Sequence, residues 1–543
     1  MKILQEKFSV VTREGIRLDA DRYYPETDEK LPILLMRQPY GRAIASTVVY
    51  AHPRWYAAQG YQVVIQDVRG CGTSEGDFHL FQTEMTDGFD TLQALQALPN
   101  STGDVGMYGF SYQGMTQLYA AASGASNLKT ICPAMVAYDL YQDWAYENHA
   151  FCWQNNLAWA IQLAALKAKH QGKIEEYQAL YQASRQLPLH EPFPINPQIL
   201  RDLAPDSFYH DWLYRPPTDP YWQILSPRYW REQLDLPMLH IGGWFDPHLR
   251  GNLRLYEALR RRSQFPQFLI IGPWGHLPWG RRIGHQDFGT EAVSEIDRFQ
   301  ITWFDHFLKG KTSALLTKSR VKLFEMGSNH WQNFEDFSLQ KQQVYYLVSE
   351  GLAAVNEQSG KLVPIPLSSP EFLPDHWVHD PWRPVPSLGG HAGFSVGIEE
   401  RSLLDSRTDV VTYTSETLTE SLTLMGSAQV ELKITADQPS FDLSVILSVV
   451  KSTGQVYGIC QGYGRFTNFQ ETIHLVLQAT YYHIPQGDRL RLSISGSCFP
   501  AYAVNSGLDQ VLAQTHLSEY QVITYTLIGG TVESKLVLPI IKN

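Results

Sequence analysis

The stretch Met107-Tyr108-Gly109-Phe110-Ser111-Tyr112-Gln113-Gly114 decides the fold that we predict for this chain. The apolar residues 105–108 are typical of a buried strand, and residues 115–122 are rich in helix formers. A serine in a sharp turn between a strand and a helix is the context of a nucleophile elbow. The flanking glycines allow the strand and the helix to approach closely, and the helix N-terminus stabilises negative charge nearby. On this motif alone, a serine in an ordinary turn between a strand and a helix stays an open alternative.

Strand and helix patterns alternate on both sides of this stretch, which predicts a mostly parallel sheet. A glycine-rich loop at 70–76 lacks the Gly-Lys-[Ser/Thr] ending of a phosphate-binding loop, so we do not expect a nucleotide there. The expected elements are a hairpin of residues 8–12 and 16–20, strands at 32–36, 61–66, 237–243 and 267–272, and helices at 55–60, 86–98 and 251–262.

The pattern changes twice along the chain, and these changes predict the domains. Helical patterns separated by proline-rich stretches fill residues 138–232, which we interpret as an insertion that caps the site. The α/β domain therefore comprises residues 1–137 and 233–312. Residues 313–543 contain short alternating segments punctuated by turn residues, including one at 321–325, and predict a β-sandwich domain.

Composition excludes several classes of function. A chain of 543 residues is too long for one core, so two or three domains are expected. The formal net charge of −11 argues against nucleic-acid and anionic-membrane partners. Five scattered cysteines without a Cys-x-x-Cys motif suggest neither a disulfide framework nor a zinc site. The sequence shows neither a signal-peptide core nor a membrane-spanning stretch, so we expect a soluble, cytoplasmic protein.

Two further loops carry residues that could complete a catalytic triad with Ser111. Asp246 and His276 each follow one of the strands that resume after the insertion, so they are expected at the same sheet edge as the serine. Their order along the chain, Ser then Asp then His, is that of a nucleophile-elbow hydrolase. His248 is an alternative base, but it shares a loop with Asp246 and is awkwardly placed to bridge Asp246 and Ser111, so we expect it to line the pocket.

An oxyanion hole needs two hydrogen-bond donors near the nucleophile. The backbone N–H of Tyr112 is one by geometry, because it follows the nucleophile directly. The other must come from the loop after an early strand, residues 37–41, where the Tyr40 hydroxyl is a candidate donor and an ordinary loop tyrosine is the alternative.

Taken together, these motifs resemble the cocaine esterase/X-Pro dipeptidyl-peptidase family of serine hydrolases, and the resemblance covers almost the whole chain. The stretches that carry it are Arg37-Gln38-Pro39-Tyr40, Asp67-Val68-Arg69-Gly70, residues 106–114, Gly242-Gly243-Trp244-Phe245-Asp246, Gly272-Pro273-Trp274-Gly275-His276, residues 380–390 and Phe499-Pro500-Ala501-Tyr502-Ala503-Val504-Asn505.

The resemblance implies an α/β-hydrolase domain with an inserted helical cap and a C-terminal jelly-roll domain, the three of which wall the acyl pocket together. It implies Ser111 as nucleophile, His276 as base and Asp246 as its orienting group, with the oxyanion hole formed by Tyr40 and Tyr112. No metal or organic cofactor is needed. Candidate pocket residues are Trp144, Trp153, His248 and the loop after Gly390.

Family members differ in substrate, so we expect a small-molecule ester or a short acyl or peptidyl substrate. The amino-ester branch binds a substrate ammonium through carboxylates placed just after the catalytic aspartate, where this chain has Pro247, His248 and Leu249. That difference counts against amino esters. A carboxylic-ester hydrolase is the leading hypothesis; an X-Pro dipeptidyl-peptidase or amidase and a non-catalytic binding protein are the alternatives. The β domain could form a homodimer interface or only an intrachain one, and the sequence leaves both open.

Overall fold

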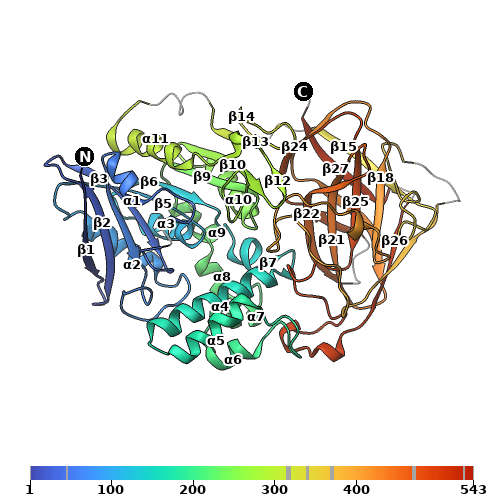
Figure 1. Cartoon of the computed structure of the whole chain (residues 1–543), viewed down its shortest axis with the longest axis horizontal. Helices are drawn as coiled ribbons and strands as arrows, with labels where there is room; N and C mark the ends of the chain where they lie inside the picture. Colours follow the sequence, from blue (N-terminus) through green and yellow to red (C-terminus); the bar gives the residue numbers. More distant parts are fainter. Residues whose placement is uncertain are drawn as a thin grey trace.

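The computed structural model describes residues 2–44, 47–312, 319–337, 341–366, 372–467, 472–529 and 532–541. Figure 1 shows an α/β domain, drawn in blue to yellow-green, beside an all-β domain drawn in yellow, orange and red. Helices drawn in blue-green lie along the lower side of the view and extend from the first domain toward the second (Figure 1). The predicted combination of an α/β-hydrolase domain and a β-sandwich domain is confirmed.

A ten-stranded sheet forms the centre of the first domain. Its order is β1-β2-β4-β3-β5-β6-β9-β10-β13-β14, and the neighbours from β4 to β13 run parallel. The predicted hairpin is present as the antiparallel pair of β1 and β2. The strands are β1 (Ile3–Val11), β2 (Arg17–Pro25), β3 (Leu31–Gln38), β4 (Gln62–Asp67), β5 (Ser101–Phe110), β6 (Leu128–Ala134), β9 (Met238–Phe245), β10 (Gln267–Gly275), β13 (Val321–Glu325) and β14 (His330–Phe334).

Helices cover both faces of this sheet because both faces are apolar. Buried residues of α1 (Pro53–Ala58) and α11 (Ile296–Lys309) pack on one face. Buried residues of α2 (Glu84–Leu95), α3 (Tyr112–Ala122) and α10 (Leu249–Arg260) pack on the other. The predicted helices at 55–60, 86–98 and 251–262 correspond to α1, α2 and α10 with shifts of a few residues at their ends.

The insertion is helical, as predicted, and its core is continuous with that of the α/β domain. Its elements are η2 (Tyr141–Ala145), β7 (Tyr146–Glu147), β8 (Ala150–Phe151), α4 (Trp153–His170), α5 (Ile174–Arg185), α6 (Gln198–Leu203), α7 (Phe208–Tyr214), α8 (Pro220–Leu225), α9 (Pro227–Trp230) and η3 (Arg231–Gln233). The chain then returns to the sheet at β9.

The second domain is all β except for short helical turns. Its strands are β15 (Lys341–Val348), β16 (Lys361–Val363), β17 (Asp375–His379), β18 (Val410–Ser415), β19 (Leu422–Gly426), β20 (Gln429–Ala436), β21 (Ser440–Val450), β22 (Val456–Thr467), β23 (Ile473–Val476), β24 (Thr480–Ile484), β25 (Arg489–Ser495), β26 (Ile523–Ile528) and β27 (Lys535–Ile541). The expected strand at 321–325 is β13, which pairs with β10. The predicted boundary at residue 312 therefore falls two strands before the end of the first sheet.

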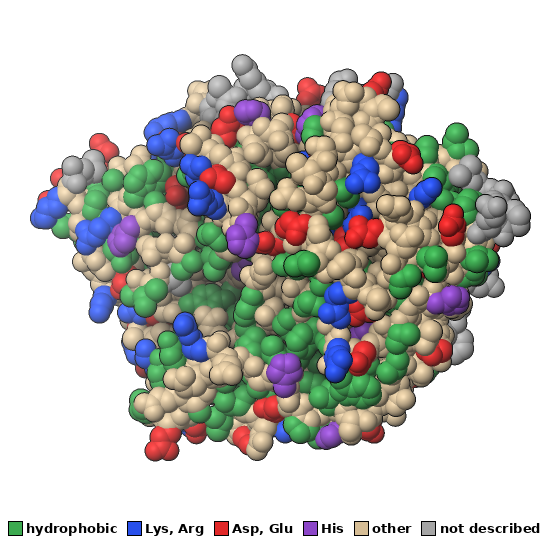
Figure 2. All heavy atoms as spheres, turned by 45° about the vertical axis from the view of Figure 1, so that its right-hand side comes forward, with side chains coloured by type: hydrophobic (Ala, Val, Ile, Leu, Met, Phe, Trp, Pro, Cys, Tyr) green, Lys and Arg blue, Asp and Glu red, His purple; other side chains and the backbone are tan. Residues whose placement is uncertain are grey.

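Figure 2 shows Lys and Arg side chains interspersed with Asp and Glu side chains over one face of the molecule. Among the described residues, no helix combines the length and the apolar character that crossing a membrane would require.

Candidate active site

Ser111 lies in a strained turn between β5 and α3. Its backbone has φ 59° and ψ −126°, a conformation that a residue with a side chain adopts only where the surrounding structure imposes it. The Ser111 N–H donates to the Ala134 carbonyl of β6 at 2.9 Å, which fixes the turn on the sheet. Gly114 makes the close approach of helix and sheet feasible, because a Cβ there would lie 2.5 Å from Val136 Cγ1. This is the geometry of a nucleophile elbow.

His276 and Asp246 meet at the carboxyl ends of β10 and β9. The His276 Nδ1 lies 2.7 Å from Asp246 Oδ1, and the carboxylate is fully buried. A carboxylate oxygen accepts, so Nδ1 carries the proton and Nε2 is left to act as a base. Gln478 of the β domain donates to the Asp246 carbonyl at 3.0 Å and supports this loop from outside the α/β domain.

The Tyr40 hydroxyl lies at the Ser111 side chain. It hydrogen-bonds with the Ser111 side chain and accepts from Trp159 Nε1 of α4 at 3.1 Å. Burial raises the pKa of Tyr40 well above its ordinary value, so the hydroxyl keeps its proton. Because an indole N–H can only donate, the bond from Trp159 uses the Tyr40 oxygen as an acceptor, and the Tyr40 proton remains available on the side of Ser111.

Tyr112, the residue after Ser111, is held by contacts on its hydroxyl and on its ring. Its hydroxyl donates to Glu84 Oε1 at 2.7 Å, and Glu84 Oε2 pairs with Arg37 Nη1 at 2.6 Å. Its ring stacks on Phe81 with the centroids 4.5 Å apart. The Tyr112 N–H is among the first amides of α3, which an α-helix leaves without intrahelical partners. That N–H and the Tyr40 hydroxyl are thus both hydrogen-bond donors beside Ser111.

A cavity of about 800 Å³ opens over these groups. Tyr40, Ser111 and His276 all line it, together with side chains of the cap and of the β domain. The predicted loop after Gly390 contributes His391 to Phe394 to the wall. Among the described residues, no group of three or more His, Cys, Asp or Glu side chains is arranged to hold a metal ion.

Two of the three predicted pocket side chains line this cavity, namely Trp144 and His248. Their rings lie 4.1 Å apart, and the His248 ring lies 5.1 Å from that of His276. Burial lowers the pKa of His248 to about 4, so its ring is neutral near pH 7. Its Nδ1 donates to the Asp143 carbonyl at 3.2 Å, which leaves Nε2 as an acceptor.

The third predicted pocket residue, Trp153, does not line the cavity. It is 1% exposed at the start of α4, and its ring packs 5.9 Å from Phe499 of the β domain. Trp159 lines the cavity instead, from the same helix. The sequence could not distinguish the two because buried residues occur on several faces of α4, so periodicity did not mark the face that points to the site.

Another group was missed by sequence reasoning: a buried ionic cluster in the wall of the cavity. Glu147 Oε2 contacts Arg250 Nη1 at 2.6 Å, His391 Nε2 at 3.1 Å and the Tyr502 hydroxyl at 2.6 Å, and the Tyr463 N–H donates to Oε1 at 3.2 Å. The Glu147 side chain is 3% exposed. Burial acts to raise its pKa, but Arg250 and then His391 outweigh burial and lower it to about 2.

This cluster joins all three parts of the molecule. Glu147 belongs to the cap, Arg250 to α10 of the α/β domain, and His391 and Tyr502 to the β domain. The sequence offered one partial signal, because Tyr502 lies in the stretch 499–505 and His391 directly follows Gly390. Nothing in the sequence placed Glu147 beside them.

Comparison with known proteins agrees with this architecture. Residues 14–278 match the X-Pro dipeptidyl-peptidase (S15 family) domain, and residues 316–536 match the X-Pro dipeptidyl-peptidase C-terminal non-catalytic domain. The chain is 30% identical to a cocaine esterase of Rhodococcus sp. over 573 aligned positions that cover 98% of each chain. It is 24% identical to a putative serine esterase of Mycobacterium bovis, with 83% of this chain and 79% of the relative covered.

Solved structures share the fold over nearly the full length. An aminopeptidase from a marine sediment Thaumarchaeota archaeon superposes with a TM-score of 0.83 at 21% identity, covering 99% of this chain and 96% of the other. An α-amino acid ester hydrolase superposes with a TM-score of 0.79 at 20% identity, covering 99% and 97%. The chain belongs to the cocaine esterase/X-Pro dipeptidyl-peptidase family of hydrolases, and it is an enzyme that cleaves esters or peptides.

Proposed function

We propose that this enzyme is a serine carboxylic-ester hydrolase that works through an acyl-enzyme. One observation carries the proposal: the strained Ser111, Tyr40 and His276, which pairs with the buried Asp246, all line one cavity. Ser111 Oγ attacks the ester carbonyl while His276 Nε2 takes its proton, and Tyr40 and the Tyr112 N–H stabilise the oxyanion. His276 then protonates the leaving alcohol, and water completes the cycle by the same route.

The electrostatics of the cavity favour a neutral ester. Among the described residues that line it, Glu147 is the one carboxylate, and it already contacts Arg250, His391 and Tyr502. A substrate ammonium would have to displace Arg250 to obtain a counter-charge, and separating a buried ion pair costs several kcal/mol, roughly 3–5. His248 offers a neutral acceptor where a carboxylate would be needed.

The same reasoning ranks the peptidase alternative lower. A dipeptidyl-peptidase releases two residues from a free N-terminus, so it has to hold the ammonium of its substrate. The saturated Glu147 supplies no charge for that purpose. Because the chain matches the X-Pro dipeptidyl-peptidase family domain, the experiment below also measures peptidase activity.

The test compares p-nitrophenyl acetate, butyrate and octanoate with Ala-Pro-p-nitroanilide, for the wild type and for Ser111→Ala. We expect ester turnover that falls by at least about 10⁴-fold in the variant, as for other triad nucleophiles. A second pair, phenylalanine methyl ester and the methyl ester of 3-phenylpropionate, isolates the ammonium, and we expect preference for the second. Turnover of the anilide alone would move the enzyme to the peptidase class, and an unchanged Ser111→Ala variant would refute the triad.

A further inference from the structure

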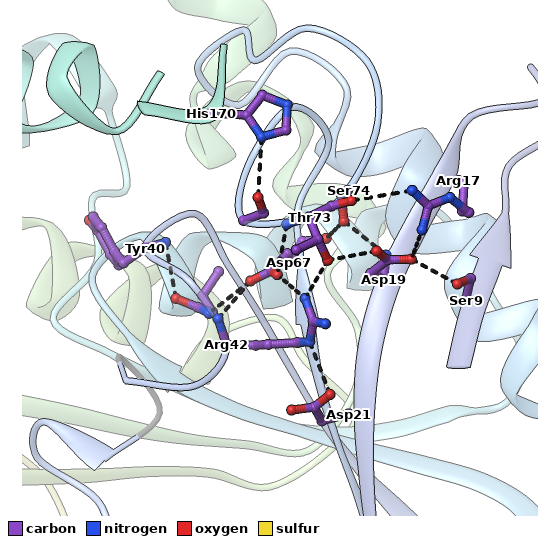
Figure 3. Close-up of polar contacts among 12 residues, drawn as sticks. Ser9, Arg17, Asp19, Asp21, Tyr40, Arg42, Asp67, Thr73, Ser74 and His170 are labelled. Atoms are coloured by element: carbon purple, nitrogen blue, oxygen red, sulfur yellow. Dashed lines mark hydrogen bonds and ion pairs between the residues drawn. The ribbon is translucent and has the colours of Figure 1, made fainter. Parts of the chain in front are cut away.

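The loop that carries Tyr40 is tied to the neighbouring strand by one carboxylate. Asp67 is the last residue of β4 and is 1% exposed. Its Oδ1 accepts from the backbone N–H of Arg42 at 2.7 Å and from Gln38 Nε2 at 3.3 Å. Figure 3 shows these contacts converging on Asp67 from the loop that carries Tyr40 and Arg42. The carboxylate therefore holds the loop on both sides of Tyr40.

Gln38 connects this carboxylate with Tyr40 itself. The Gln38 side chain donates to Asp67 through Nε2 and accepts the Tyr40 backbone N–H through Oε1 at 3.0 Å. Gln38 and Asp67 are register partners at the ends of the parallel strands β3 and β4, so both residues of this hydrogen-bond chain lie on rigid strands. It fixes the Tyr40 backbone, while Trp159 fixes the Tyr40 hydroxyl.

Asp67 is in turn held from its other side. Its Oδ2 pairs with the Arg42 guanidinium and accepts the Thr73 N–H at 3.4 Å. Gly72 has φ +59°, and a Cβ there would lie 2.1 Å from Asp67 Oδ2, so the glycine-rich loop is in close contact with the carboxylate. This close contact leaves no room for the longer side chain of glutamate at position 67.

We infer that Asp67 is a positioning residue for the oxyanion donor Tyr40, acting through Gln38 and the backbone of residues 40–42. The inference rests on the proposed function, because it assigns Asp67 a role in that reaction. An oxyanion donor has to lie within hydrogen-bond distance of the developing charge, and a misplacement of about 1 Å can cost on the order of 10²-fold in rate. This inference also gives the stretch Asp67-Val68-Arg69-Gly70 a physical role at the site, because the Asp67 carboxylate fixes the conformation of the loop that carries Tyr40.

The test is a double-mutant cycle of Asp67→Asn and Tyr40→Phe, measured on p-nitrophenyl butyrate. Asparagine keeps the shape of Asp67 but has no charge and only one acceptor oxygen. It therefore cannot accept both from the Arg42 guanidinium and from the backbone N–H of Arg42 as the two carboxylate oxygens do. We expect Asp67→Asn to lower kcat about tenfold with KM changed less than about twofold in the Tyr40 enzyme. In the Tyr40→Phe background the further loss should be less than about twofold, because the hydroxyl to be positioned is gone.

Two variants keep the result unambiguous. Asp19→Asn removes a carboxylate of the same polar network, which bonds Ser9, Arg17 and Thr73 but not residues 38–42, and it should leave kcat within about twofold. Gln38→Met removes the hydrogen bonds that connect Asp67 with the Tyr40 backbone but keeps the Asp67 charge. It should therefore lower kcat in the Tyr40 enzyme and not in the Tyr40→Phe enzyme, even where Asp67→Asn does not fold. Equal fold-losses in both Tyr40 backgrounds, or an unchanged kcat, would overturn the inference.

A second readout separates this inference from the proposed function. Phosphonylation of Ser111 by a fluorophosphonate uses the same oxyanion donors and needs no particular acyl group. The cycle can therefore be repeated on the second-order labelling rate, with the same pattern expected. Labelling that shows the coupling while esters are not turned over would refute the ester assignment alone, whereas ester turnover without coupling would refute the role of Asp67 alone.

Discussion

Replacing Glu147 by glutamine tests whether the buried cluster holds the three parts of the enzyme together. The substitution keeps the shape of the side chain but leaves Arg250, which contacts Glu147 at 2.6 Å, without its counter-charge. Removing one partner of a buried pair usually destabilises a protein by about 3–5 kcal/mol. A carboxyl whose pKa falls from 4.5 to about 2 on folding gives a similar figure, on the order of 3 kcal/mol.

The lowered pKa also fixes the direction of the pH dependence. Glu147 is a stronger acid in the folded state than in the unfolded chain, so its contribution is fully present above its unfolded pKa of 4.5. It declines as the pH falls from there toward about 2 and the carboxylate takes up its proton. The stability difference between the wild type and Glu147→Gln should therefore shrink over that interval.

Urea unfolding followed by tryptophan fluorescence at pH 7, 5, 4 and 3 measures this difference. Glu26→Gln is the matched control, because Glu26 pairs with Lys2 at 3.2 Å on the surface and should contribute less than about 1 kcal/mol. We expect Glu147→Gln to lower the apparent free energy of unfolding by about 3 kcal/mol at pH 7. A loss below about 1 kcal/mol, or a loss that stays constant down to pH 3, would refute the reasoning.

Three further predictions concern the site. Tyr40→Phe should lower kcat on aryl esters by about 10²–10³-fold with KM nearly unchanged, and a loss under about fivefold in steady-state assays would remove Tyr40 from the oxyanion hole. Gly114→Ala should lower the thermal midpoint by several degrees and slow fluorophosphonate labelling, because the added Cβ would lie 2.5 Å from Val136 Cγ1; an unaltered melting curve would contradict the close packing. Trp144→Ala should shift the chain-length optimum of p-nitrophenyl esters toward longer acyl groups, and an optimum that stays in place would show that Trp144 does not limit the pocket.

Local patterns sufficed for the elements that carry the proposed triad. A short apolar run before Ser111 and helix formers after it predicted β5 and α3, and the strand-ending loops of Asp246 and His276 followed from the same alternation. Chain order then placed all three at one edge, because the carboxyl ends of parallel strands share that edge. The contact between His276 and Asp246 at 2.7 Å is what this order leads one to expect.

Contacts between distant segments could not be predicted in this way. The pairing of Glu147 with Arg250, His391 and Tyr502 depends on how the cap and the β domain pack on the α/β domain, and no local period encodes that packing. The assignment of β13 to a domain also depends on contacts between distant segments. Its alternating pattern suits either domain, and its pairing with β10 places it in the sheet of the α/β domain.

Trapping the covalent intermediate tests the central claim most directly. The enzyme is mixed with p-nitrophenyl butyrate, quenched in acid within the first turnovers, digested and analysed by mass spectrometry. The mechanism predicts a butyryl group on the peptide that contains Ser111, and none in Ser111→Ala. Butyryl label on another residue, or ester turnover that persists undiminished in Ser111→Ala, would contradict it.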